Sequence, residues 1–278
     1  MKKLYISDLD GTLLTPEGKI SSYSLERLNA LLDQGVYFTV ATARSASTAV
    51  HILENLHLTL PVILMNGIAV YDRNAGKYVE NEAMEHDIKS NIFHVLDREK
   101  SPAFVYAIKD DKLYCYAPPF LNEEMKQFRS ERERLYNKVF TDIDSYYDLE
   151  DEDIIYFTLV GKKTELENVY EAVRSIPGVE ALFYEDVYTD DWFIEIHEEG
   201  VSKGSAALAI KNEVGADELV VFGDNLNDLP MIQVADYAYV VENGKDKVKA
   251  LADEVIGKNT EDSVVKVLEK IIKQEGEE

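Results

Sequence analysis

Two acidic motifs, one near each end of the sequence, follow apolar runs that are typical of buried strands. Asp8 and Asp10 end the run LYISDLD, and Asp224 follows the run VVFG. Alternate residues of an extended chain point to the same side, so the side chains of Asp8 and Asp10 can share one site. Carboxylates held this close repel one another, and a bound divalent cation relieves the repulsion. The pattern therefore predicts an Mg²⁺ site that Asp8, Asp10 and Asp224 build together.

Two further expected strand ends offer groups that bind phosphate. Thr42 closes the apolar run FTVAT and offers a hydroxyl, and the amides after it are expected to open a helix, which favours anions. Lys203 begins a predicted helix and offers a cation. Taken singly, Thr42 is typical of a helix cap and Lys203 of a solvated surface. Their place at strand ends, where open α/β sheets bind ligands, favours a combined metal and phosphate site.

Other chemistries fail on the order or the spacing of the residues. The stretch GVSKG matches the hydrolase pattern G-x-S-x-G, but all five histidines precede Ser202, whereas that mechanism needs a later histidine base. A calcium loop counted from Asp8 would have Thr12 and Leu13 where it needs an acid and a glycine. The nucleotide-binding patterns G-x-x-x-x-G-K-[ST] and G-x-G-x-x-G are absent from the sequence. Serine hydrolases, calcium loops and these nucleotide-binding folds are thus disfavoured.

The elements that must position the candidate residues alternate between strands and helices at both ends of the sequence. Strands alternating with helices predict βαβ units and a parallel sheet. A hairpin is expected around residues 74–76, where two short alternating runs flank Asn-Ala-Gly. Strands are expected within 3–8, 36–44, 60–67, 218–224 and 237–241, and helices within 21–35, 203–216 and 261–273.

The middle of the sequence has a different pattern, in which hairpin-like strand pairs are separated by helices. One hairpin is expected to turn at Asp110 and Asp111, and helices are expected at 122–139 and at about 164–175. Strands are expected near 179–184 and 191–196. The sequence therefore predicts a discontinuous α/β domain of residues 1–83 and 193–278, with an α+β domain of residues 84–192 inserted into it.

The composition limits the partners and the location that we expect. The 278 residues carry a formal net charge of −24, spread over both expected domains, and such a surface repels nucleic acids and anionic membranes. No apolar run approaches the ~18 residues of a membrane span. The start of the chain does not resemble a signal peptide, and the single Cys115 fits a reducing compartment. We expect a cytoplasmic protein without nucleic acid or membrane partners; protein partners and oligomeric state are not predicted.

The order of these motifs resembles that of the haloacid dehalogenase superfamily, in particular its Cof-type phosphatases with an inserted α/β cap. DLDGT is similar to the first motif of the family, TAR to the second, VSKG to the third and GDNLND to the fourth. The resemblance covers nearly the whole chain and implies a Rossmannoid parallel-sheet core with a C2-type cap that selects the substrate. The chain departs from the family at Ala43 and Ser263, where glycine is common. Alanine keeps the backbone N–H, so anion binding survives at position 43 unless that position needs a positive φ.

The resemblance also implies a role for each matching residue. Asp8 would be the nucleophile that forms an aspartyl-phosphate, and Asp10 would act as general acid and then as base. Mg²⁺ would be held by the Asp8 carboxylate, the Asp10 backbone carbonyl and the Asp224 carboxylate. The phosphoryl oxygens would be held by the amides of Leu9 and Ala43, by Thr42, Lys203 and Asn227, with Asp228 orienting Lys203 or a metal-bound water.

These roles predict a Mg²⁺-dependent phosphatase of small phosphorylated metabolites. Sugar phosphates are the first expectation for the substrate, and phosphorylated cofactors are the second. Two alternatives stay open. A phosphotransferase or mutase would pass the phosphoryl group from Asp8 to another hydroxyl, and a non-catalytic module would only sense a phosphate ester. The sequence does not identify the substrate, the cap residues that select it or the pathway.

Overall fold

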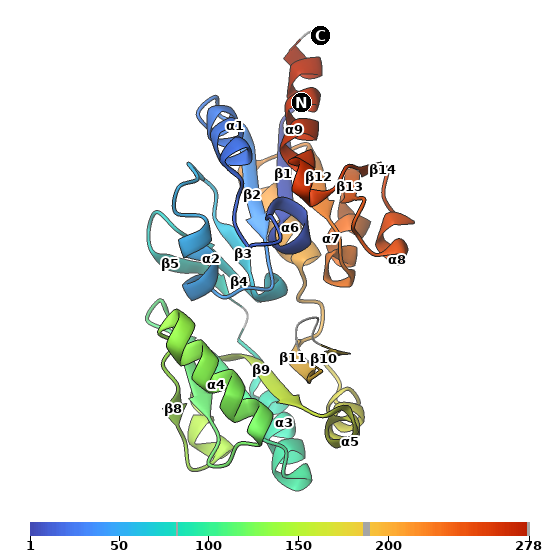
Figure 1. Cartoon of the computed structure of the whole chain (residues 1–278). Coiled ribbons are helices and arrows are strands. Elements are labelled where there is room, and N and C mark those ends of the chain that lie inside the picture. Colours follow the sequence, from blue (N-terminus) through green and yellow to red (C-terminus); the bar gives the residue numbers. More distant parts are fainter. Residues whose placement is uncertain (82, 186–189, 277–278) are drawn as a thin grey trace. The chain divides into compact units, whose positions relative to one another are not determined.

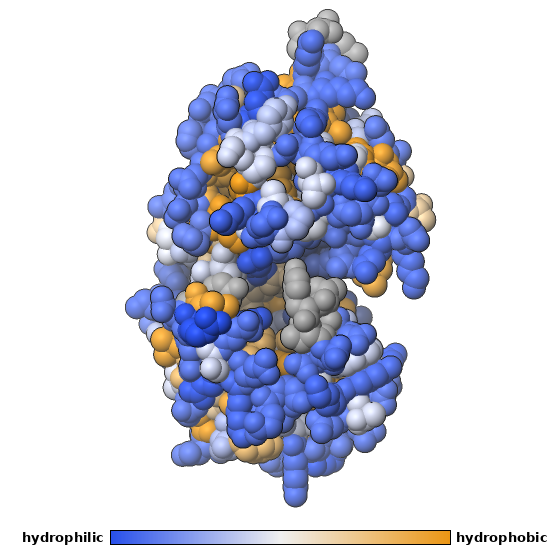
Figure 2. Space-filling view, in the orientation of Figure 1, coloured by the Kyte–Doolittle hydropathy of each residue, from blue (hydrophilic) through white to orange (hydrophobic). Residues whose placement is uncertain are grey.

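The computed structural model describes residues 1–81, 83–185 and 190–276, which belong to two compact units (Figure 1). The first unit comprises Met1–Glu80 and Val201–Glu278, and the second comprises Asn81–Gly200. The face drawn in Figure 2 is mainly hydrophilic on both units, in keeping with the net charge of −24. Within the described residues, no helix is both long enough and apolar enough to cross a lipid bilayer.

The first unit contains an eight-stranded sheet with the order β14-β13-β12-β1-β2-β3-β4-β5. The strands from β14 to β3 pair in parallel, which confirms the predicted parallel α/β core, and β3 pairs antiparallel with β4. The strands are β1 (Lys3–Asp8), β2 (Tyr37–Ala41), β3 (Val62–Leu64), β4 (Ala69–Asp72), β5 (Lys77–Asn81), β12 (Glu218–Gly223), β13 (Tyr237–Val241) and β14 (Glu254–Ile256).

Strands β1 and β12 lie next to each other in the interior of this sheet, which places their ends in one location. Leu4 and Tyr5 of β1 and Leu219 and Val220 of β12 are buried, and neighbouring residues of a strand point to opposite faces, so both strands are covered on both faces, as expected for central parallel strands. The register pairs Ser7 with Phe222. Both strands therefore end at the same edge of the sheet, and the acidic residues that follow them emerge side by side.

The helices of the first unit begin and end where local capping allows. Ser21 caps the first helix, since its hydroxyl accepts a hydrogen bond from the amide of Ser24. Ser202 caps α6 in a capping box with Ser205, and Gly215 ends that helix in the left-handed conformation with φ of 63°. The helices are α1 (Ser22–Leu32), α2 (Ala46–Ile52), α6 (Lys203–Val214), α7 (Leu229–Val234), α8 (Asp246–Lys249) and α9 (Ser263–Gly276), with short helical turns at Leu9–Leu13, Met65–Gly67, Leu226–Asp228 and Asn259–Glu261.

The second unit contains a six-stranded sheet with the order β10-β11-β9-β6-β7-β8. Its β6–β7 hairpin turns at Asp110 and Asp111, both left-handed, as a two-residue turn between twisted strands favours. The strands are β6 (Phe104–Lys109), β7 (Lys112–Ala117), β8 (Thr141–Asp142), β9 (Ile154–Gly161), β10 (Val179–Glu185) and β11 (Trp192–Glu198). The helices are α3 (His86–Glu99), α4 (Glu123–Tyr136) and α5 (Lys163–Val173), with a short turn at Tyr146–Leu149.

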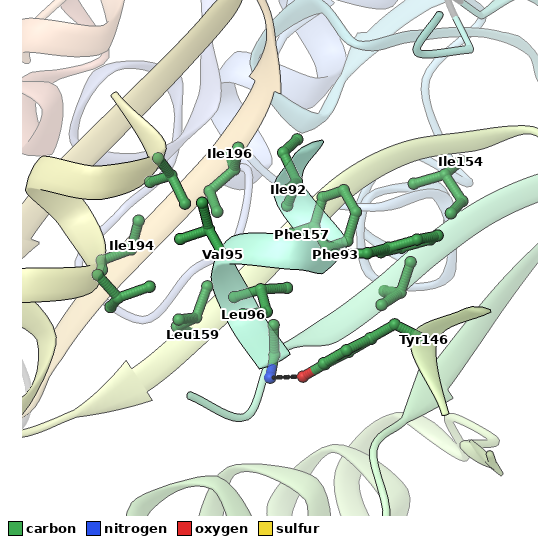
Figure 3. Packing of buried hydrophobic residues seen from close by; sticks show 14 of the residues in the cluster. Ile92, Phe93, Val95, Leu96, Tyr146, Ile154, Phe157, Leu159, Ile194 and Ile196 are labelled. Carbon is green, nitrogen blue, oxygen red and sulfur yellow. Dashed lines mark hydrogen bonds between the residues drawn. The ribbon is translucent and has the colours of Figure 1, made fainter. Parts of the chain in front are cut away.

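An aliphatic and aromatic core joins α3 to this second sheet. Figure 3 shows Phe93 of α3 beside Phe157 of β9, and their ring centroids are 6.0 Å apart. The hydroxyl of Tyr146 closes the edge of this core, since it accepts a hydrogen bond from the amide of Ala103 at 2.7 Å. The core therefore occupies one face of the sheet and holds the second unit together independently of the first.

The second boundary between the units differs from the one that the sequence predicts. Strand β11 pairs antiparallel with both β9 and β10, so it is part of the second sheet. The boundary thus falls between residues 200 and 201 and not between 192 and 193. The prediction was wrong here because an apolar run indicates a strand but does not indicate which of two sheets will pair with it.

Candidate active site

A fully buried lysine lies between two buried aspartates at the carboxyl ends of the central strands. The Lys203 ammonium donates to Oδ1 of Asp8 at 2.6 Å and to Oδ1 of Asp228 at 2.7 Å. The side chains of Lys203 and Asp228 are 0 % exposed, and Asp8 as a residue is 4 % exposed. Removing charges from water is costly unless they are paired and hydrogen-bonded. These three residues, from three distant parts of the chain, therefore form one interdependent group.

Close backbone packing fixes the start of α6, which carries Lys203. Gly67 has a φ of 103°, and a Cβ added there would lie 2.1 Å from the carbonyl oxygen of Ser202. A Cβ added to Gly204 would lie 2.4 Å from the carbonyl oxygen of Pro230. Glycine at both positions lets the turn after β3 and the helix α7 approach the first turn of α6. The backbone of these two elements therefore fixes the position of the helical turn that carries Lys203.

Asp228 uses both of its carboxylate oxygens inside the protein. Its Oδ1 accepts from Lys203, and its Oδ2 accepts from the backbone amides of Asp224 at 2.9 Å and Asn225 at 3.0 Å. A residue so fully engaged is suited to positioning its neighbours. Its hydrogen bonds join Lys203 to the turn that carries Asp224, and the implied role of Asp228 in orienting the lysine stays a prediction.

Thr12 also lies at this site, although the sequence analysis did not predict it. Its buried hydroxyl donates to Oδ1 of Asp224 at 2.8 Å. The turn that carries Thr12 depends on Gly11, which has a φ of 85° and whose added Cβ would lie 2.5 Å from Oδ2 of Asp224. The DGT spacing in the first motif is the signal that could have suggested Thr12.

Replacing Gly11 by alanine should therefore damage the site and the stability together. The new methyl group would meet the Asp224 carboxylate, and a left-handed backbone disfavours alanine by roughly 1 kcal/mol or more. We expect a lower midpoint of thermal unfolding and lower activity than for Gly76→Ala. Gly76 also has a positive φ, but a Cβ there would meet nothing within 4 Å. Equal effects of the two substitutions would contradict the proposed contact with Asp224.

The electrostatics of the cluster reflect an excess of negative charge. Burial, with Asp228 and Asp224 adding to it, raises the pKa of Asp8 well above its ordinary value despite the opposing effect of Lys203. Burial, followed by repulsion from Asp228, raises the pKa of Asp224 to about 6. Burial alone would lower the pKa of Lys203, but the carboxylates of Asp228 and Asp8 outweigh it and raise that pKa. One ammonium thus faces three carboxylates.

The donor set of this cluster fits a hard divalent cation. Carboxylate oxygens of Asp8, Asp224 and Asp228 lie within 4.8 Å of one another, and oxygen ligands are those that Mg²⁺ prefers. Because Asp228 already binds Lys203 and two amides, Asp8 and Asp224 are the carboxylates better placed to hold an ion. The carboxylate of Asp10 does not join the cluster, and a contribution from its backbone carbonyl stays a prediction.

Asp10 instead forms a two-point ion pair with Arg44. Its Oδ2 accepts from Nε of Arg44 at 2.8 Å and its Oδ1 accepts from Nη2 at 2.7 Å. Both side chains are partly exposed. A paired guanidinium and carboxylate of this geometry holds both groups in one orientation. The structure therefore separates the two acids of the first motif: Asp8 is turned inward to Lys203, and Asp10 is turned to Arg44.

The expected phosphate-binding residues are only partly brought together. Thr42 is buried, and its hydroxyl accepts from the amide of Arg44 at 3.1 Å. The helix expected after Thr42 is α2, which begins at Ala46 with Ser45 as its N-terminal cap, so residues 43–45 separate it from Thr42. The intervening residues form a loop that is stabilised by the Thr42 side chain.

The remaining candidates occupy the surrounding loops. Asn227 donates to the side-chain oxygen of Asn66 at 3.0 Å, Ala43 is exposed, and Leu9 is buried in the turn after β1. A further residue, Asn243, donates to the carbonyl of Gly11 at 2.8 Å and was not anticipated. Binding of phosphoryl oxygens by Leu9, Ala43, Thr42, Lys203 and Asn227 remains a prediction.

Comparison with known proteins assigns this arrangement to a family. The family model of haloacid dehalogenase-like hydrolases matches residues 5–268, so the chain belongs to that family. The chain is similar to two 5-amino-6-(5-phospho-D-ribitylamino)uracil phosphatases of Bacillus subtilis. It is 25 % identical to one of them, with 96 % of this chain and 94 % of the relative covered. It is 23 % identical to the other, with 94 % of each chain covered.

Solved structures agree with the fold. The crystal structure of a Thermotoga maritima protein superposes with a TM-score of 0.78 at 24 % identity, covering 97 % of both chains. At this level of identity the similarity supports the architecture of a parallel-sheet core with an inserted unit. The chain is thus an enzyme of the haloacid dehalogenase-like hydrolases.

Proposed function

We propose that this hydrolase is a Mg²⁺-dependent phosphatase of small phosphorylated metabolites, acting through an aspartyl-phosphate on Asp8. The observation that carries the proposal is the 2.6 Å contact between the fully buried Lys203 ammonium and one oxygen of Asp8. An anionic carboxylate attacks an anionic phosphate ester only where their mutual repulsion is offset. Lys203 offers this offset at the nucleophile itself, and it aligns the carboxylate at the same time.

The proposed reaction has two balanced steps. In the first, an oxygen of Asp8 forms a bond to phosphorus, the bond to the leaving oxygen breaks, and Asp10 gives its proton to that oxygen. In the second, Asp10 takes a proton from water, whose oxygen attacks phosphorus and releases Asp8 and inorganic phosphate. Mg²⁺, held by Asp8 and Asp224 when bound, would neutralise negative charge between the nucleophile and the phosphoryl group.

Arg44 has a place in this scheme because it holds the acid. The two-point pair with Arg44 fixes the Asp10 carboxylate in the substrate-free enzyme. To donate a proton, Asp10 would exchange this partner for the leaving oxygen. The lysine variant Arg44→Lys, which keeps the charge but loses the two-point geometry, should lower turnover more than it raises KM.

For the substrate we propose a phosphorylated sugar, sugar alcohol or cofactor. Two relatives are named for a phosphoribitylamino-uracil, which combines a phosphorylated polyol with a heterocycle. We further propose that residues 81–200 act as the cap that selects the leaving group. A panel of phosphorylated metabolites, with water as the only acceptor, tests the proposal through release of inorganic phosphate. Transfer to a sugar hydroxyl without such release would favour the phosphotransferase alternative, and tight binding without turnover would favour the sensor.

The raised pKa of Asp224 predicts how pH and Mg²⁺ act on stability. Its pKa of about 6, against an ordinary value of 3.8, means that the native state binds this proton more tightly than the unfolded chain does. Without metal, this group's contribution to stability should therefore fall as pH rises from 4 to above 6. Mg²⁺ should restore stability at pH 7.5 and have little effect at pH 5, because protons compete for the same oxygens.

Thermal unfolding with and without Mg²⁺ at the two pH values measures this effect, with Asp224→Asn as the matched control. The asparagine variant cannot titrate at this position and should gain little stability from Mg²⁺ at either pH. A Mg²⁺-dependent gain that is equal in both proteins would contradict a site at Asp224.

A further inference from the structure

In the second unit, two basic side chains lie over aromatic rings. Nζ of Lys138, two residues beyond the end of α4, lies 4.3 Å from the ring centroid of Tyr106 and 5.7 Å from that of Phe140. The guanidinium carbon of Arg132, on α4, lies 4.2 Å from the ring centroid of Phe128. We call these five residues the Lys138 site. It lies entirely within the second unit.

Lys138 has no acidic partner among the residues that the structure describes. Two neighbouring bases on α4 do pair: Arg132 contacts Glu131 at 3.1 Å, and Arg129 contacts Glu133 at 2.9 Å. The absence is notable in a chain with 53 acids and 29 lysines and arginines. Lys138 instead faces the rings of Tyr106 and Phe140.

The surroundings of Lys138 disfavour an isolated positive charge. Burial lowers the pKa of Lys138, and the nearby charge of Arg132 lowers it further. The groups beside it are neutral, since burial raises the pKa of the Cys115 thiol to about 12 and that of the Tyr106 hydroxyl well above its ordinary value. Cation–π contact recovers part of this cost, typically about 0.5–2 kcal/mol. An anion bound at Lys138 would offset the remaining cost of burying the positive charge.

Exposed apolar residues near Lys138 in the sequence indicate what kind of anion fits. Val139 directly follows Lys138 in the sequence, Leu135 lies three residues before it, and both side chains are exposed. Apolar side chains beside a cation suit an acidic group carried on a small organic molecule better than a fully hydrated inorganic ion. Carboxylate and phosphate oxygens are the groups that lysine and arginine bind in such surroundings.

We propose that Lys138, assisted by Arg132, binds the carboxylate or phosphate group of a small organic anion. This site is separate from the Asp8 cluster in composition and does not depend on the proposed reaction. The anion is either a second acidic group of the substrate or a separate effector, and the two sources have different kinetic consequences.

Protection of Lys138 from chemical acetylation tests the binding directly on the full-length wild-type protein. An amine-acetylating reagent is applied with and without citrate, inorganic phosphate or a sugar bisphosphate, and each lysine is quantified by peptide mass spectrometry. We expect at least one probe to slow acetylation of Lys138 by about tenfold or more at a concentration well above its dissociation constant. Lys126, which pairs with Glu123 at 2.7 Å on the same helix, should change little.

The variant Lys138→Met distinguishes the two sources, because methionine keeps an apolar stem against the rings but removes the charge. If the anion is part of the substrate, the variant should raise KM by about tenfold for bisphosphates but not for the matching monophosphates. If the anion is an effector, KM should be unchanged and saturating substrate should leave the protection of Lys138 intact. Equal acetylation of Lys138 with and without every probe would overturn the proposal and leave Lys138 as a purely structural cation.

Discussion

Replacing Asp8 by asparagine should reduce phosphate release by roughly 10⁴-fold or more, since an amide cannot act as the attacking nucleophile. The same change should leave the fold intact or slightly more stable. Lys203 keeps its 2.7 Å contact with Asp228, and one of three crowded carboxylates is removed. Steady-state assays of phosphate release and thermal unfolding together measure the two effects.

The matched control for this prediction is Asp246→Asn. Asp246 has a side chain that is 98 % exposed and lies in the first turn of α8, so its loss should change neither activity nor stability measurably. Activity of Asp8→Asn above about a tenth of wild type would be incompatible with a nucleophilic role for Asp8.

Replacing Lys203 by methionine is the second change with a large expected effect. It would leave Asp8 and Asp228 buried without a cation, and breaking a buried ion pair from one side typically costs about 3–5 kcal/mol. We expect the first unit to unfold at a much lower denaturant concentration and phosphate release to be lost. Chemical denaturation, monitored by a probe in the first unit, measures the loss of stability. The unfolding of the second unit serves as the internal reference.

A double substitution separates the charge effect from simple loss of packing. Lys203→Met combined with Asp8→Asn removes both partners of the 2.6 Å contact, so fewer unpaired charges remain. The double variant should be more stable than Lys203→Met alone by about 1 kcal/mol or more. If Asp8→Asn changes the free energy of unfolding by the same amount with and without Lys203→Met, Lys203 and Asp8 are not energetically coupled and the description of the cluster is wrong.

The parallel core and the meeting of its acidic ends could be predicted from the sequence. Central parallel strands are apolar along their whole length, so the point where a run such as VVFG reaches Asp224 marks a strand end. All such ends lie at one edge of the sheet. Asp8, Asp224 and Asp228 therefore had to lie near one another once the strand order was given. Lys203 follows β11, a strand of the second sheet, so its place beside them does not follow from a strand end.

Other features depend on contacts that periodicity does not encode. The pair between Asp10 and Arg44 requires a loop before α2, and that loop forms because the amide of Arg44 binds the Thr42 hydroxyl. The contact from Thr12 to Asp224 requires the left-handed turn at Gly11. Strand β11 belongs to the second sheet because it pairs with β9 and β10. Each is set by a neighbour that is distant in sequence or by a turn geometry.

The most direct test of the account is to trap the covalent intermediate. The enzyme is mixed with a phosphorylated substrate that it turns over, then treated with borohydride, which reduces an aspartyl-phosphate to homoserine, and its peptides are mapped by mass spectrometry. We predict homoserine at position 8 in the presence of substrate, and unmodified aspartate at that position without substrate. Substrate-dependent reduction at another carboxylate, or full turnover with position 8 never modified, would contradict Asp8 as the nucleophile.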